Sequence, residues 1–194
     1  MRARLALSVS GVRVTLREVL LRDKAPAFLA ASPSATVPCL QLQSRVIDES
    51  HDIMLWALGR NDPQGWLNMP IEGHALIAAN DGPFKTALDR YKYASRHTDA
   101  DPLAERSNAS DCLRGLDQRL KGRGWLFGKD PTLADMAILP FVRQFAHVDP
   151  DWFTGQPWPD LIRWLDAFKT SDRFAAIMPR YAIWQDGDAP IYFP

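Results

Sequence analysis

The stretch from Ser34 to Met54 holds the residues best suited to chemistry. Glu49 and Ser50 precede an apolar run typical of a helix, and the first N–H groups of a helix have no partner within it and carry partial positive charge. Together with the Ser50 hydroxyl, those groups suit a carboxylate. The Glu49 carboxylate can pair with an ammonium group. The sequence therefore indicates a site for the head of an α-amino acid.

The dipeptide Val37-Pro38 lies upstream, in a segment with the pattern of a strand. Pro38 has no backbone N–H, and the peptide bond before it can be cis. The N–H and C=O groups of Val37 are then available to a ligand in place of a neighbouring strand. We therefore include Val37 and Pro38 among the candidate binding residues.

A purely structural interpretation of these residues stays open. Val-Pro is a common dipeptide, and Asp48, Glu49 and Ser50 ahead of an apolar run can mark no more than the start of a helix. The order of the elements around them is what favours a binding site.

The first 60 residues alternate helical and strand patterns. Gly11 is placed as a C-cap, and polar and apolar residues alternate after it, as they do in a strand. The expected elements are a helix at 2–10, a strand at 13–19, a helix at 26–31, strands at 37–42 and 45–47, and a helix at 50–58. We expect an α/β domain at 1–60.

Residues 61–70 are rich in turn formers and are the expected linker. Beyond them we find almost no strand pattern, so 71–194 is the expected all-α domain, with an irregular tail from Ile183. The expected helices are 71–79, 83–97, 102–121, 133–147, 159–169 and 173–178, the first two being interrupted at Asp81-Gly82-Pro83.

The helix after Thr132 carries a capping box. The Thr132 hydroxyl can accept from the Asp135 N–H, while the Asp135 carboxylate accepts from the Thr132 N–H. The residues that follow are apolar nearly all round, as expected for a helix through the centre of a bundle. Capping accounts for Asp135, and we interpret it as structural.

Composition excludes several classes of function. Lysine plus arginine number 23 and aspartate plus glutamate number 23, so no net charge attracts nucleic acid or an anionic membrane. No apolar stretch is long enough for a membrane span, and the start lacks the pattern of a signal peptide. Cys39 and Cys112 stand far apart, and no spacing suggests a metal site. We expect a cytoplasmic protein without a metal.

Taken together, these features resemble the glutathione S-transferase family. The resemblance rests on Val37-Pro38, on Glu49-Ser50 at a helix start, on the all-α second half and on the capping-box helix. Three further segments, at 21–26, 130–135 and 184–188, also resemble segments of family members. The resemblance runs from Met1 to the end of the chain. It implies a thioredoxin-like first domain that binds glutathione and a helical bundle that lines the pocket for a small electrophile. It also implies a homodimer.

The resemblance assigns a role to each candidate residue. It implies that the backbone of Val37, beside a cis Pro38, pairs with the cysteinyl part of glutathione. Glu49 and Ser50 hold the γ-glutamyl head, and Lys24 reaches the glycyl carboxylate. An ordinary solvated loop lysine is an equal interpretation of Lys24. The implied reaction is conjugation, or glutathione-dependent thiol exchange or reduction.

The chain departs from the family at its start. Members of the family begin with a strand, and the residue that activates the glutathione thiol lies at the end of that strand or just after it. In this chain, residues 1–7 instead resemble the start of the helix that follows a Cys-Pro-x-Cys segment in some members. The family pattern places the activating residue upstream of Met1, so no catalytic residue is assigned. The true start can lie upstream, the chain can be a shortened non-catalytic interaction protein, or another residue can have taken over the role. For Cys39, a buried strand position argues against reactivity. We favour the first explanation, because the rest of the site looks intact.

Overall fold

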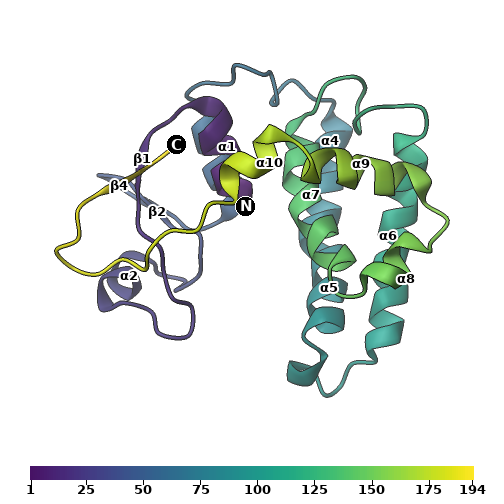
Figure 1. The fold of residues 1–194 in the computed structure, drawn as a ribbon, viewed down its shortest axis with the longest axis horizontal. Coiled ribbons are helices and arrows are strands. Elements are labelled where there is room, and N and C mark those ends of the chain that lie inside the picture. Colours follow the sequence, from purple (N-terminus) through teal and green to yellow (C-terminus); the bar gives the residue numbers. More distant parts are fainter. The chain divides into compact units, whose positions relative to one another are not determined.

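The computed structural model describes all residues, 1–194. They form two compact units (Figure 1). The first unit combines Met1–Gly65 with Asp172–Pro194, and the second is Trp66–Ser171.

The first unit is built on a pair of packed helices. The α1 helix ends at Gly11, whose φ of 66° lies in the left-handed region that glycine tolerates. Leu5 of α1 and Ile53 and Met54 of α3 are fully buried where the two helices pack. The elements in chain order are α1 (Arg2–Ser10), β1 (Val14–Leu16), α2 (Pro26–Ala31), β2 (Leu40–Gln41), β3 (Val46–Ile47), α3 (Ser50–Leu58), α10 (Asp172–Ile177) and β4 (Ile191–Phe193).

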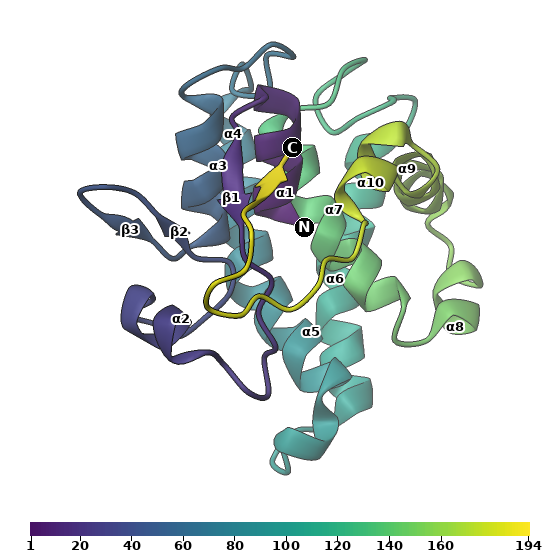
Figure 2. The ribbon, with the colours of Figure 1, turned by 60° about the vertical axis from the view of Figure 1, so that its left-hand side comes forward.

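Two short antiparallel sheets complete this unit. The β2 and β3 strands form a hairpin with Leu40 opposite Ile47. The β1 strand pairs with β4, from the other end of the chain, with Val14 opposite Phe193. Figure 2 shows β4 alongside β1. The strands are shorter than the sequence predicts, but the α-β-α-β-β-α order of the first 60 residues is present.

The C-terminal residues depart from the expected division at 71–194. The α10 helix packs on α1, and β4 completes the sheet of β1, so residues 172–194 belong to the first unit. The tail also contains a strand where the sequence predicts irregular structure. Burial of Phe193, which is 3% exposed, accounts for this placement. The sequence does not predict the strand, because a single buried side chain leaves no periodic pattern.

Every named element of the second unit is a helix. The α5 helix packs against α6, α6 against α9, and α7 against both α4 and α9. The Asp149 carboxylate caps α8, which the sequence analysis missed, by accepting from the Trp152 N–H at 3.1 Å. The elements are α4 (Ile71–Ala79), η1 (Asn80–Phe84), α5 (Lys85–Lys92), η2 (Ala94–Arg96), α6 (Pro102–Leu120), α7 (Leu133–Ala146), α8 (Pro150–Thr154) and α9 (Pro159–Lys169).

The expected interruption between α4 and α5 is a π-helical turn. The chain stays helical through η1, with Pro83 inside it. Proline lacks the N–H that an α-helix would use at this point, and a single wider turn accommodates the missing hydrogen bond. No helix in the chain is long and apolar enough to cross a membrane.

Candidate functional site

The start of α3 presents two polar side chains with no partner. Glu49 is the N-cap, with extended backbone at φ −87° and ψ 130°, and its carboxylate does not cap the helix. Ser50 is the first helical residue. Glu49 is exposed and Ser50 half-buried, and neither side chain makes a hydrogen bond or ion pair. A carboxylate, a hydroxyl and the N–H groups of the first helical turn therefore stand together, available to a ligand.

Asp48 joins this helix start to the loop that precedes β2. Its Oδ1 accepts from the Ser32 hydroxyl at 3.0 Å, and its Oδ2 accepts from the Ser34 N–H at 3.2 Å. From the sequence, Asp48 is expected only to mark the start of a helix, and this contact was not predicted. The signal in the sequence was an aspartate near a serine-rich turn. Aspartate and serine side chains readily hydrogen-bond to nearby backbone groups, so this pairing could have indicated the contact.

The Val37-Pro38 segment follows that loop. The peptide bond between the two residues is cis. Val37 is 44% exposed and lies ahead of β2, which begins at Leu40, so the expected strand at 37–42 is shorter than predicted. The Val37 N–H and C=O have no backbone partner. Pairing of β2 with β3 and the Asp48 anchor tie this segment to the start of α3.

Lys24 stands in the loop between β1 and α2. The loop turns where the Asp23 N–H donates to the Leu20 carbonyl at 3.0 Å. The Lys24 side chain is half-buried and has no hydrogen-bond or ion-pair partner. The loop makes no hydrogen bond or ion pair with Glu49 or Ser50, so the structure groups these two with each other and leaves Lys24 on a separate segment.

Cys39 and Asp48 influence each other's proton affinity. Burial raises the pKa of the Cys39 thiol, and the hydrogen bond to Asp48 and its negative charge raise it further, against a smaller opposing effect of Ser32. Burial also acts to raise the pKa of Asp48. Donation from Ser34, Cys39 and Ser32 outweighs that effect, and the pKa of Asp48 lies below its ordinary value. Cys39 is therefore held as a thiol.

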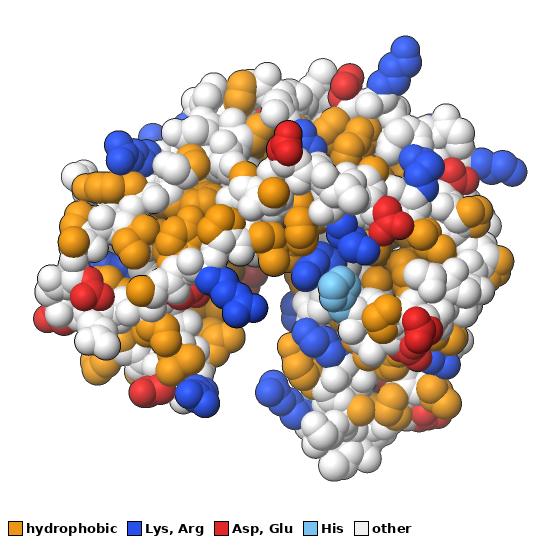
Figure 3. Space-filling view, viewed as in Figure 1, with side chains coloured by type: hydrophobic (Ala, Val, Ile, Leu, Met, Phe, Trp, Pro, Cys, Tyr) orange, Lys and Arg blue, Asp and Glu red, His pale blue; other side chains and the backbone are white.

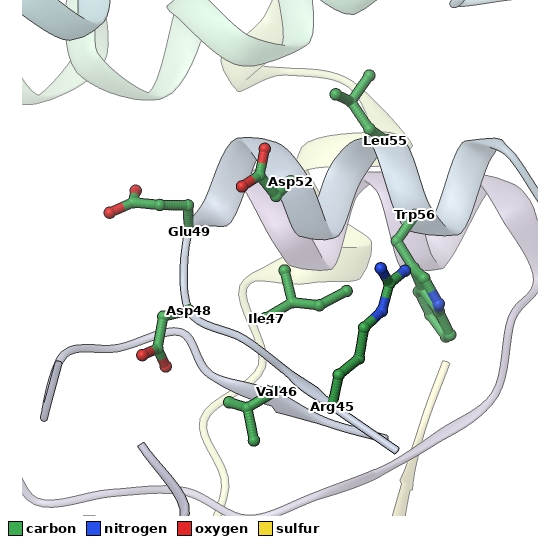
Figure 4. Close-up of a pocket in the computed structure, with 8 residues that line it drawn as sticks. All are labelled: Arg45, Val46, Ile47, Asp48, Glu49, Asp52, Leu55 and Trp56. Carbon is green, nitrogen blue, oxygen red and sulfur yellow. The ribbon is translucent and has the colours of Figure 1, made fainter. Parts of the chain in front are cut away.

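A hollow of about 540 Å³ lies beside α3. Figure 4 shows Asp48 and Glu49 at the end where the helix begins, while Arg45 extends toward Trp56 at the other end. Its lining consists of Arg45, Val46, Ile47, Asp48, Glu49, Asp52, Leu55 and Trp56. Carboxylates gather at one end and a guanidinium stands at the other, a division of charge that suits a ligand carrying both signs.

The surface of the first unit also carries apolar side chains (Figure 3). Val37, Leu29 and Leu55 are among those that are more than a third exposed. No group of three or more histidine, cysteine, aspartate or glutamate side chains is arranged to hold a metal ion.

Two family models match the chain. Residues 1–65 match the glutathione S-transferase N-terminal domain, and residues 84–167 match the glutathione S-transferase C-terminal domain. No curated protein matches the chain in sequence.

Solved structures share the fold over nearly the whole chain. A glutathione transferase family member from Pseudomonas fluorescens Pf-5, with two glutathione bound, superposes with a TM-score of 0.75 at 20% identity, covering 91% of this chain and 86% of that one. BphK, a bacterial glutathione transferase, gives 0.76 at 18% identity over 91% of both chains. Maleyl pyruvate isomerase, a bacterial Zeta-class transferase, gives 0.70 at 23% identity over 91% of this chain and 90% of that one.

Proposed function

Because the chain belongs to the glutathione S-transferase family, we propose that it binds glutathione in its first unit and uses the glutathione thiol on a small electrophile. The observation that carries the proposal is the unpartnered pair Glu49 and Ser50 at the start of α3, tied through Asp48 to the unpaired backbone of Val37. These groups match an amino-acid head followed by a peptide.

Each residue fits one part of the tripeptide. The Glu49 carboxylate pairs with the γ-glutamyl ammonium, and the Ser50 hydroxyl and the α3 N-terminus receive the γ-glutamyl carboxylate. The Val37 N–H and C=O pair with the cysteinyl backbone, beside Pro38. Lys24, which has no partner of its own, receives the glycyl carboxylate. Glutathione then supplies the nucleophilic thiol for conjugation, or for thiol exchange or reduction.

The proposal includes a homodimer and a location in the cytoplasm, as the family resemblance implies. The family pattern also divides the sequence into domains at 1–60 and 71–194, joined by 61–70, although residues 172–194 pack within the first unit.

A non-catalytic interaction protein of the same fold is the second candidate. The raised pKa of Cys39 supports it, because a thiol that holds its proton at neutral pH is a weak nucleophile and so a poor substitute for the activating residue. The two candidates differ in turnover. Two assays on the same preparation separate them: conjugation of glutathione to 1-chloro-2,4-dinitrobenzene, and glutathione-dependent reduction of hydroxyethyl disulfide. An enzyme turns over at least one of these substrates, and a non-catalytic interaction protein turns over neither.

Glutathione binding itself is tested by isothermal titration calorimetry. Replacing Glu49 by Gln keeps the side chain's shape and removes the charge that pairs with the ammonium. We expect binding to weaken about tenfold, which corresponds to about 1.4 kcal/mol. Glu72→Gln is the matched control, since Glu72 is an exposed glutamate in the first turn of another helix, α4. Equal affinities for wild type and Glu49→Gln would contradict the assignment of Glu49, and no binding to the wild type would contradict the proposed function.

A further inference from the structure

The C-terminal residues 181–193, here called the clasp, hold the segment that leads into the Lys24 loop. The β4 strand pairs with β1 along its whole length. Further along, Glu18 forms a parallel bridge with Ile183, and the Trp184 N–H donates to the Glu18 carbonyl at 3.0 Å. The clasp therefore fixes the backbone from β1 up to Glu18.

Two arginine–aromatic stacks fasten the clasp at both ends of this segment. The Arg13 guanidinium lies 4.3 Å from the centre of the Tyr192 ring. The Arg17 guanidinium lies 4.2 Å from the centre of the Trp184 ring. Arginine stacks well on aromatic faces because its planar cation is weakly hydrated. Side chains therefore reinforce the backbone contacts at each end.

The Lys24 loop begins where the clasp ends. The Leu20–Asp23 turn follows directly, and Lys24 comes after it, two residues before α2 starts at Pro26. The loop is thus held by the clasp at one end and by α2 at the other. Fixing both ends of a short loop reduces the conformations that its side chains sample.

We infer that the clasp positions Lys24 for the glycyl carboxylate of glutathione, and that Trp184 is the positioning residue. The inference rests on the proposed function. Trp184 has no contact with a ligand in this role, and acts through Arg17 and the Glu18 carbonyl.

Calorimetry with two ligands tests the inference. Glutathione amide differs from glutathione only in that its glycyl carboxylate is a neutral carboxamide. The ratio of the two dissociation constants therefore measures recognition of that carboxylate. We expect the wild type to prefer glutathione about threefold, as one partly exposed ion pair would give. Lys24→Ala is expected to abolish the preference.

Trp184→Ala is expected to abolish the preference as well, while its affinity for glutathione amide stays within about twofold of wild type. Adding Lys24→Ala to it should change nothing further, because both substitutions remove the same interaction. Trp152→Ala is the matched control. Trp152 is also half-buried and stacks on an arginine, Arg106, at 4.2 Å, but it belongs to the second unit. The control should keep the wild-type preference.

Other outcomes overturn the inference. Trp184→Ala with the wild-type preference would show that Lys24 is positioned without the Trp184 side chain, and so would contradict its role as the positioning residue. Equal weakening of both ligands would show a general loss of structure. Trp184→Leu, which keeps apolar bulk and removes the ring, is measured in parallel; if neither variant folds, by circular dichroism, the clasp serves folding instead. A wild type that binds neither ligand would show that the proposed function has failed, which is a separate result.

Discussion

At the scale of single residues, Asp48 organises the candidate site. It accepts from Ser32 and Ser34, and so joins the loop before Val37 to the start of α3. Its neighbours Glu49 and Ser50 are left without partners. One aspartate satisfies the local donors, and the side chains that follow it remain available for recognition.

The Asp48 carboxylate also controls the reactivity of Cys39. Because burial and Asp48 both raise the pKa of the thiol, we expect iodoacetamide to modify Cys39 with a pH midpoint above that of a free cysteine. Asp48→Asn removes the negative charge and should move the midpoint down. Rates are measured by mass spectrometry in a Cys112→Ser background. A wild-type midpoint at or below that of free cysteine would contradict this account.

At the scale of elements, α7 is held by its buried N-terminus. Asp135 is 0% exposed and accepts from the N–H groups of Leu126 and Thr132, from the Thr132 hydroxyl and from Trp164 Nε1, at 2.8–3.0 Å. Burial raises the pKa of Asp135, and these donors oppose that effect. The capping box that the sequence predicts is present.

Removing one donor from this carboxylate should destabilise the chain. Trp164→Phe leaves the fully buried Asp135 carboxyl group with one hydrogen bond fewer, and we expect a loss of about 2–3 kcal/mol in the free energy of unfolding. Trp158→Phe is the control, because the equally buried Trp158 donates only to the neutral Phe153 carbonyl, at 3.1 Å, and should cost about 1 kcal/mol. Urea unfolding at pH 7 measures both. A Trp164→Phe variant no less stable than Trp158→Phe would argue against a special role of the carboxylate.

At the scale of the whole molecule, the first unit is assembled from both ends of the chain. Residues 1–65 alone lack α10 and β4, and so lose the buried side chains of Ile177 and Phe193. The end of residues 1–65 lies close to the start of residues 172–194, because Arg173 donates to the Gln64 side chain at 2.8 Å.

The chain's division predicts how fragments behave. We expect residues 1–65 alone to show no cooperative thermal transition, since so small a chain without part of its core is marginal. Joining residues 1–65 to 172–194 through a short glycine linker should restore the transition, as followed by circular dichroism. Cooperative unfolding of 1–65 on its own would show that the C-terminal residues are dispensable for this unit.

The sequence by itself determined the family, the order of the elements and the capping box. Each of these depends on residues close together in the chain: an apolar period, a proline or glycine at an element's end, or a threonine three residues before an aspartate. The polar groups Glu49 and Ser50 could be selected for the same reason, since both are defined by one helix start.

Only the tertiary structure decided where the C-terminal tail goes and what Asp48 does. The tail's strand is three residues long and exists because β1 offers it an edge, a partner nearly 180 residues away. Asp48 gains its role from serines across a loop, and Trp184 from an arginine and a carbonyl near the other end of the chain. Such contacts form between segments that are distant in the sequence and become neighbours only when the chain folds. No local pattern of residue types predicts them.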